Sequence, residues 1–320
     1  VRIVAAGRDR MDTIARMLNS GPHPSRRPAD NLADLRAQIA ACRRGLDGVR
    51  SLAAAIGPSA LSDDAAAMLA VSRGMVLAAL APFAGRTLHA SDRLDDGSPV
   101  AVRITMPAGS VPDPPVIDFA GSAATHPGPF NAPRAVTASA VTYALRLLVD
   151  ADVSLDDGLL EAVDLRIPPG MLDPVLDADP AGSPAVAAGN VETSQRVVDV
   201  LVRAFGLAAS GQGTMNNVLF GDESFGFYET VGGGAGATAE GEAAGGVHVH
   251  MSNTAITDPE TLERRHPVRL ERFGLRPGSG GAGRHVGGEG LERVYRFMRP
   301  LRLSVITSRR VAGPPGHEGG

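Results

Sequence analysis

The sequence has 320 residues, of which 43% are hydrophobic and 21% are charged, and a formal net charge of −4. A chain of this size can bury a substantial core in one large domain or in two closely packed ones. The small acidic excess argues against a general nucleic-acid-binding protein, since such proteins usually carry a basic excess. Asp63, Asp64 and Arg73 interrupt the most apolar stretch, residues 51–83, so we expect packed helices there and no membrane-spanning segment.

Two residue counts bear on location and chemistry. Cys42 is the single cysteine, so no intrachain disulfide can form, and the N-terminus lacks the apolar core of a secretory signal. Both features predict a cytoplasmic protein.

All 31 basic residues are Arg, which a GC-rich genome explains. Without Lys there is no Schiff-base former and no phosphate-loop cation, so we expect no ATP bound by such a loop in this chain.

The first part of the chain is predicted to be helical. A short helix pattern covers residues 11–18, and apolar residues then return at helical spacing from 29 to 56. A second long helix is expected over residues 61–81. We expect these two to form a long antiparallel pair, and we assign residues 1–84 to a helical segment. The inner face of the second helix is expected to carry Met68, Val71, Met75 and Leu80.

Near residue 85 the pattern changes to short strands with interspersed helices. Helices are expected over residues 132–149, with Asn131 as a cap and Pro133 at the start, and within residues 187–205. The expected strands cover residues 87–90, 99–106, 116–119 and 227–231. The whole pattern predicts an α/β (α+β) protein, in which an N-terminal helical pair precedes a mixed, glycine-rich β-sheet region at residues 85–320.

Two dense glycine clusters occupy the C-terminal half, at residues 232–237 and 278–283. Glycine supplies positive φ angles and close backbone approach. Turns between short strands are the plain interpretation of these clusters, and we prefer it for the second one. Residues 278–283 also match G-x-G-x-x-G, but a dinucleotide fingerprint must open a helix directly after a strand. The residues that follow cannot begin a stable helix, so we reject dinucleotide binding there.

Polar side chains crowd the predicted start of a helix at residues 187–196. A helix N-terminus offers free N–H groups and a positive dipole end, which suit an anion or a polarised carbonyl. An ordinary capped helix, with Asn190 as the cap and Thr193 three residues on, is the alternative. Helix capping by itself does not account for the two further polar side chains, Glu192 and Gln195.

A second polar cluster follows at residues 210–217. Gln212, Thr214, Asn216 and Asn217 are spaced by glycine and present carboxamides on a tight backbone. Carboxamides bind amides and carboxylates through paired donors and acceptors. A surface turn is the competing interpretation.

His248 and His250 form an H-x-H pattern in a predicted strand, where both side chains would point to one face. Two imidazoles so placed can bind one metal, which makes them weak candidate ligands. Glu229, Glu192 or Asp258 would have to complete such a site. The alternative is that each histidine forms a hydrogen bond with a neighbouring strand or with substrate.

These segments resemble the hydantoinase B / 5-oxoprolinase B-subunit family in order and spacing. The resemblance implies ATP-dependent opening of cyclic amides such as hydantoins or 5-oxoproline, and some relatives carboxylate ketones instead. It also implies an A-type partner subunit, a sugar-kinase-like ATPase, with the B-type subunit completing the reaction, commonly around a divalent metal. The matching segments are residues 34–40, 131–136, 187–196, 212–217, 228–236, 248–254, 257–260 and 276–283.

One family feature is absent. Family B subunits are longer at the N-terminus, and their His-His-Ala-Asp type metal motif has no counterpart in this sequence. We therefore expect a C-terminal portion of a longer subunit, with the metal supplied by the missing N-terminal half and ATP used by the A-type partner. The expected assembly is a hetero-oligomer that takes a small cyclic amide and binds neither nucleic acid nor membrane.

The main alternative to an enzyme subunit is a non-catalytic assembly module that binds the A-type partner, and a nucleotide-binding oxidoreductase ranks below both. If the chain is part of an enzyme subunit, we expect four catalytic residues and eight that bind substrate. The expected catalytic residues are Glu192, Glu229, His248 and His250. The expected substrate-binding residues are Asn190, Thr193, Gln195, Gln212, Thr214, Asn216, Asn217 and Asn253.

Overall fold

The computed structural model describes residues 1–20, 24–109, 113–179, 181–317 and 319. Its contacts divide the chain into two units. The first comprises Val1–Ala67, Leu219–Phe227 and Leu301–Leu303, and the second comprises Met68–Val218, Tyr228–Pro300 and Ser304–Gly320. The domain boundary expected after residue 84 stays a prediction.

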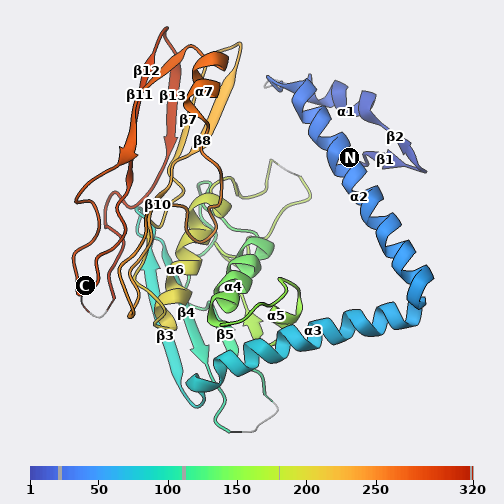
Figure 1. Cartoon of the computed structure of the whole chain (residues 1–320), viewed down its shortest axis with the longest axis vertical. Coiled ribbons are helices and arrows are strands. Elements are labelled where there is room, and N and C mark those ends of the chain that lie inside the picture. The colour runs from blue at the N-terminus through green and yellow to red at the C-terminus, as the bar shows by residue number, and fades with distance from the viewer. Residues whose placement is uncertain (21–23, 110–112, 180, 318, 320) are drawn as a thin grey trace. The chain divides into compact units, whose positions relative to one another are not determined.

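Helices and several small sheets make up the fold, which confirms the expected α/β class (Figure 1). The helices are α1 Met11–Leu18, α2 Pro28–Ile56, α3 Pro58–Leu80, α4 Arg134–Leu148, α5 Gly158–Glu161, α6 Ser194–Ala204 and α7 Pro259–Arg265, with a 3-10 turn η1 at Ala81–Phe83 and a π turn η2 at Gly189–Thr193. The strands are β1 Val4–Ala5, β2 Arg8–Asp9, β3 Thr87–Arg93, β4 Pro99–Thr105, β5 Val116–Asp118, β6 Asp164–Arg166, β7 Asn217–Gly221, β8 Gly226–Thr230, β9 Gly233–Gly234, β10 Gly245–Val247, β11 Val268–Leu275, β12 Leu291–Phe297 and β13 Arg302–Ile306.

The long helices α2 and α3 occur where the apolar periodicity placed them, and their antiparallel pairing stays a prediction. Helix α2 buries none of its residues. On α3, Leu80 is buried, whereas Met68 and Val71 are 58% and 61% exposed. Periodicity identifies a helix and its apolar stripe, but it does not identify what covers that stripe.

The segment Pro58–Phe83 also corrects the expectation that no apolar stretch is long enough to span a bilayer. Among the described residues it is the one helix with that length and composition, with a mean hydropathy of 1.7 over its best window. Length and composition alone are weak evidence, because core helices of water-soluble proteins meet the same test.

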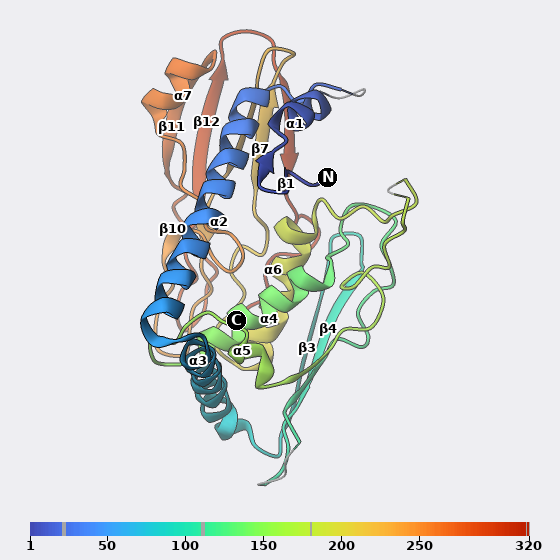
Figure 2. The ribbon, with the colours of Figure 1, turned by 90° about the vertical axis from the view of Figure 1, so that its right-hand side faces the viewer.

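A four-stranded sheet in the order β3-β4-β5-β6 carries the core of the second unit. Strands β3, β4 and β5 pair antiparallel, and β6 lies parallel to β5. Along β4, Val100, Val102 and Ile104 are buried in alternation, as the sequence predicts. Helices α4 and α6 pack against each other, and α6 lies against β3 and β4 (Figure 2). This packing fixes α6, whose first turns carry the candidate site.

Asn131 is not the cap of α4, contrary to expectation. Pro133 occupies the N-cap position, and no side chain caps the helix. The Asn131 side chain is fully buried, accepts from the His126 backbone N–H at 2.7 Å and donates to the carbonyl oxygens of His126 and Ala185 at 2.9 and 3.0 Å. It therefore links the loop before α4 to the segment that leads into η2.

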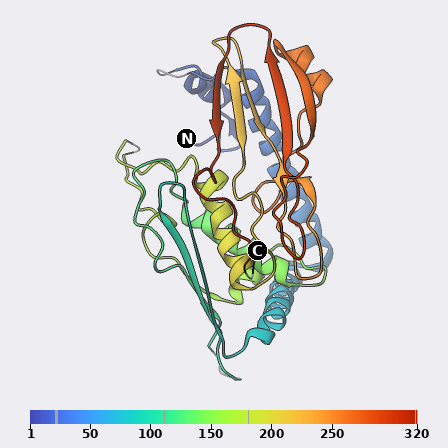
Figure 3. The same cartoon turned by 90° about the vertical axis from the view of Figure 1, so that its left-hand side faces the viewer.

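The other sheets are small. Strands β11 and β12 form a long antiparallel hairpin, β9 pairs with β10, β1 pairs with β2, and β13, β7 and β8 form a three-stranded sheet in that order. The segment after β13 returns to α6, which is seen from the opposite side in Figure 3. This return brings residues 307–309 to the start of α6.

Replacing Gly189 with Ala tests how tightly η2 is seated. A Cβ at Gly189 would lie 2.3 Å from the Asn131 carbonyl oxygen, so we expect a loss of about 1–3 kcal/mol in the free energy of unfolding. Gly74→Ala is the control, because a Cβ there meets open space within α3 and should raise stability slightly. Urea unfolding measures both, and equal stability of the two variants would contradict the packing described.

Candidate functional site

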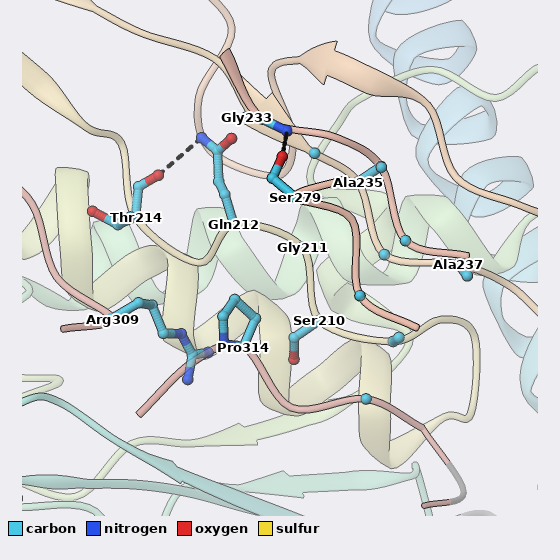
Figure 4. Close-up of a pocket in the computed structure, with 18 of the residues that line it drawn as sticks. Ser210, Gly211, Gln212, Thr214, Gly233, Ala235, Ala237, Ser279, Arg309 and Pro314 are labelled. Carbon is cyan, nitrogen blue, oxygen red and sulfur yellow. Dashed lines mark hydrogen bonds between the residues drawn. The ribbon is translucent and has the colours of Figure 1, made fainter. Parts of the chain in front are cut away.

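A cavity of about 1320 Å³ opens in the second unit. Glycine-rich segments form most of its wall, together with the segment after β13 (Figure 4). Gln212, Thr214, Asn216 and Asn217 all line it. The polar cluster that the sequence singled out at residues 210–217 therefore converges on one hollow, and it is not an ordinary surface turn.

The carboxamides of this cluster are only partly satisfied by the protein. Gln212 Nε2 donates to the Thr214 carbonyl at 2.9 Å, but Gln212 Oε1 has no partner among the described residues. Asn217 Oδ1 accepts from Thr230 Oγ1 at 2.7 Å, while its buried Nδ2 likewise has no partner in the described chain. Asn216 Oδ1 accepts from Thr307 Oγ1 at 2.7 Å. One buried acceptor and one buried donor thus remain available, which buried polar groups in proteins rarely are.

Glu192 stands behind two hydroxyl groups of the cavity wall. It lies on η2, is almost fully buried, and accepts from Thr214 Oγ1 at 2.7 Å and from Ser308 Oγ. Burial raises the pKa of the Glu192 carboxyl, and hydrogen bonds from Ser308 and Thr214 and the charge of Arg196 only partly oppose the shift. The π turn brings this carboxyl to the wall, in keeping with the frequent use of such turns at functional sites.

Arg309 joins two buried carboxylates. It donates to both Asp92 oxygens at 3.2 and 2.6 Å and to Asp199 Oδ2 at 2.9 Å. His250 Nε2 lies 3.1 Å from Asp199 Oδ1. Burial alone would raise the pKa of Asp199, but the hydrogen bond from His250 and the charges of His250, Arg309 and Arg196 together lower it. Asp199 therefore stays ionised and pairs with Arg309.

Arg196 connects this ion network to Glu192. It is fully buried and donates to the Gly213 carbonyl and to Ser308 Oγ, the latter at 3.2 Å. Its Nε lies 3.8 Å from Asp92 Oδ2. Burial lowers the pKa of Arg196, and the charge of Arg309 adds to that effect. The guanidinium nevertheless stays charged, since arginine does not deprotonate in proteins.

Glu229 occupies a separate, closed cluster. One oxygen accepts from the Thr257 backbone N–H at 2.7 Å, and the other accepts from Tyr295 Oη at 2.7 Å and lies 3.0 Å from Arg293 Nε. Burial and the neighbouring Glu229 raise the pKa of Tyr295. Arg293 and Tyr295 line the cavity, whereas Glu229 lies behind them. Both of its oxygens are occupied, so this geometry stabilises the cavity wall.

The expected strand geometry of the H-x-H pattern is wrong. Strand β10 ends at Val247, and His250 has a φ of 56°, so the two histidines do not share a strand face. His248 Nε2 lies 3.3 Å from Thr254 Oγ1, whereas His250 pairs with Asp199. Burial lowers the pKa of His248. Within the part of the chain that the structure describes, no three His, Cys, Asp or Glu side chains gather as a metal site would require.

The remaining predicted site residues lie away from the cavity. Asn190 and Asn253 are exposed, and Asn190 caps no helix, because Thr193 holds the N-cap position of α6 without a side-chain cap bond. Thr193 donates to the Phe130 carbonyl at 2.5 Å. Gln195 is fully buried and its amide has no partner among the described residues. The expectation of a capped helix start is therefore wrong.

The sequence interpretation missed Asp92, Asp199, Ser308 and Arg309 as members of the site. A signal for Asp199 exists, because Glu192, Arg196 and Asp199 follow helical spacing in a segment otherwise rich in valine. Asp92 and the pair Ser308 and Arg309 offer no such signal. Asp92 reaches the site because α6 packs on β3, and Ser308 and Arg309 reach it through the return of the chain after β13.

Comparisons with known proteins bear on the whole chain. The family model described as hydantoinase B/oxoprolinase matches residues 1–320. The 5-oxoprolinase 1 of Arabidopsis thaliana is 41% identical over 92% of this chain, and the 5-oxoprolinase of Saccharomyces cerevisiae is 37% identical over 92%. In both cases the chain spans only 24% of the relative's length.

Two solved structures share the fold. An ATP-dependent caprolactamase from Pseudomonas jessenii superposes with a TM-score of 0.76 at 21% identity, covering 92% of this chain and 53% of the other. A nucleotide-free acetone carboxylase superposes with a TM-score of 0.78 at 16% identity, covering 96% of this chain and 44% of the other. At these identities the likeness concerns the fold alone.

The raised pKa of Glu192 predicts a pH-dependent stability difference between the wild type and Glu192→Gln. The folded protein holds this proton more tightly than the unfolded chain, so wild-type stability rises as pH falls through the raised pKa. Gln has no proton to take up, and the variant should lack that rise. Thermal unfolding of both proteins across roughly pH 5 to 8 isolates the effect. A difference in Tm that does not vary with pH would contradict it.

Removing the cation that joins the two aspartates should be strongly destabilising. Arg309→Met leaves Asp92 and Asp199 without their shared partner, so we expect a loss of about 3–5 kcal/mol in the free energy of unfolding. Arg310→Met removes a neighbouring but exposed guanidinium and should unfold as the wild type does. Urea titration measures the free energy of unfolding of both variants. If the two variants lose similar amounts, the buried pairing of Arg309 contributes nothing special to stability.

Proposed function

This chain belongs to the hydantoinase B/oxoprolinase family, and we propose that it is the amide-binding part of a B-type subunit in an ATP-dependent cyclic-amide hydrolase. The proposed substrates are hydantoin or 5-oxoproline-like lactams, and the proposed partner is an A-type ATPase subunit. The relatives named 5-oxoprolinase and the structural likeness to a caprolactamase support this choice of chemistry. Because the chain spans about a quarter of those oxoprolinases, the activity belongs to the complete enzyme.

The observation that carries the proposal is a pair of buried, unsatisfied amide atoms in residues that line the cavity. A lactam presents one N–H donor and one carbonyl acceptor, so it needs one acceptor and one donor in return. Gln212 Oε1 and Asn217 Nδ2 are buried, unpaired within the described chain and part of residues that line the cavity. A cyclic amide would satisfy both atoms, and the stabilisation gained would be large because each otherwise stays desolvated without a partner.

Glu192 is proposed to move the protons of ring opening. Hydrolysis adds water to the amide carbon, breaks the C–N bond and places a proton on the departing nitrogen. The hydroxyls of Thr214 and Ser308 both line the cavity and donate to Glu192, so each can pass a proton between this carboxyl and a bound molecule. A carboxyl whose pKa is raised holds its proton up to a higher pH than an ordinary one, which suits it to give and take a proton.

Charge balance in the buried network fits this role. Asp92 and Asp199 are compensated by Arg196 and Arg309, which leaves Glu192 as the remaining carboxyl. These five side chains are together neutral when Glu192 carries its proton, in keeping with the raised pKa of that carboxyl.

The described residues do not fit a metal ion, because His248 and His250 have separate partners and no third ligand joins them. In the proposed complex, a divalent metal belongs to the remainder of the subunit, and ATP is used by the A-type partner.

The test is an ATP-dependent hydrolysis assay with 5-oxoproline and hydantoin, on the complete subunit together with its A-type partner. Glu192→Gln should lower kcat by about 100- to 10,000-fold, because proton transfer loses its carboxyl. Glu223→Gln, at an exposed position in the β7–β8 turn, should leave kcat unchanged.

Three other results would overturn the proposal. Full activity of Glu192→Gln would remove the proposed role of the carboxyl. Consumption of acetone and bicarbonate without amide hydrolysis would instead identify a ketone carboxylase. Co-purification with the A-type subunit without any turnover would identify an assembly module.

A further inference from the structure

The glycine-rich walls of the cavity are built from backbone packed on backbone. A Cβ at Gly234 would lie 1.8 Å from the Gly288 carbonyl oxygen, and a Cβ at Gly236 would lie 1.8 Å from that of Ala209. Hydrogen bonds join the same layers, from Gly288 N to Ala235 O at 3.0 Å and from Ala209 N to Ala237 O at 2.9 Å. Only glycine fits at these two positions, because a Cβ would overlap with the backbone of the facing segment. As a consequence these segments project few side chains, and the chemistry of the cavity depends on the few residues that do reach it.

The charged side chains among those few are all cationic. Of the residues that the structure describes, Arg276, Arg284, Arg293, Arg309 and Arg310 line the cavity, and no Asp or Glu does. The charges of two of these five arginines are balanced by buried carboxylates that do not line the cavity. Arg293 pairs with Glu229, and Arg309 pairs with Asp92 and Asp199. The cavity thus carries an uncompensated positive charge.

Three arginines supply that charge. In the described part of the chain, Arg276 and Arg284 have no side-chain partner of any kind, and the Arg310 guanidinium donates to Thr307 Oγ1 at 2.8 Å without meeting a carboxylate. Arg272 and Arg296, by contrast, pair with Glu292 and Glu271. Guanidinium groups left without acids around a concave wall focus a positive potential into it.

We propose that Arg276, Arg284 and Arg310 form an oxyanion-binding rim of the cavity, which takes a carboxylate or phosphate group of a small molecule. The planar guanidinium matches the two oxygens of such groups with parallel hydrogen bonds. The identity of that molecule as an anionic cyclic amide rests on the proposed function. A ligand of this kind would place its amide at Gln212 and Asn217 and its oxyanion at the rim of the same cavity.

The rim also sets a substrate preference. 5-Oxoproline carries a carboxylate on its lactam ring, whereas 2-pyrrolidinone is the same ring without it. An oxyanion rim should therefore favour 5-oxoproline over 2-pyrrolidinone, and the difference should depend on the arginines and on ionic strength.

The test is calorimetric titration of the complete enzyme with inorganic phosphate, 5-oxoproline and 2-pyrrolidinone. The double variant Arg276→Gln/Arg284→Gln should lose at least about tenfold in affinity for the anionic probes, equal to about 1.4 kcal/mol, and keep its affinity for 2-pyrrolidinone. The control is Arg264→Gln/Arg265→Gln, which makes the same change in net charge at exposed positions in the last turn of α7.

The outcomes separate the sources of the anion and the two proposals. Binding of phosphate alone identifies a phosphate group as the partner of the rim, and binding of 5-oxoproline alone identifies a carboxylate. The rim is refuted when the wild type binds neither anion, or when the arginine variant binds both as tightly as the control. Binding is measured without turnover, so a loss of anion affinity in the double arginine variant supports the rim even when the complex shows no hydrolysis. If the complex hydrolyses the lactam and the variant binds anions as the wild type does, the rim is refuted and the proposed function stands.

Discussion

The ion pairing of Arg309 with Asp92 and Asp199 is the constraint on which the candidate site depends. Asp92 lies on β3, Asp199 on α6, and Arg309 in the segment after β13, so one side chain joins three parts of the second unit that are distant in sequence. All three side chains are largely buried. Buried ion pairs contribute little net stability compared with apolar packing, but losing one partner is costly. The arrangement therefore selects one position for the returning segment.

That position determines the environment of Glu192. Ser308 directly precedes Arg309, and its hydroxyl donates to Glu192 while accepting from Arg196. If the segment were placed elsewhere, Glu192 would lose one hydroxyl donor and the cavity would lose part of its wall. Burial of the carboxyl, which raises its pKa, depends on the same closure. The electrostatics of the site thus follow from a tertiary contact, and the local sequence around Glu192 does not determine them.

The sequence predicts local structure well and distant pairing poorly. Helix α2 begins and ends where the apolar periodicity and Gly57-Pro58 indicate, and β4 buries alternate residues as expected. The inner face expected for α3 was wrong at Met68 and Val71, because an apolar stripe does not reveal what covers it. The strand placed at His248 and His250 failed because the chain leaves β10 at Val247 and turns through a positive φ at His250. Gly245 and Gly246, just before this turn, make that departure easier than the alternation suggested.

The candidate site shows the same division. The run from Gln212 to Asn217 was recognisable because all of its polar groups lie on one short, glycine-spaced segment, and the structure brings them to one cavity. Asn190 and Thr193 looked similar but belong to a helix start whose first turn is a π turn, which directs Glu192 inward and leaves Asn190 outside. Nothing in the sequence near Asp92 indicates that Arg309 will reach it. Residues that act through long-range ion pairs require the fold before they can be recognised.

The use of arginine as the sole strongly basic residue separates two kinds of charge in this cavity. Arginine stays protonated at any pH the protein experiences, so the rim of Arg276, Arg284 and Arg310 keeps a constant positive charge. Glu192, by contrast, is a group of the network whose charge can change, and it lies behind the wall. A fixed positive rim attracts and orients an anion without competing for protons. Proton transfer can then be adjusted in the buried network by burial and pairing, with little effect on how the anion is held.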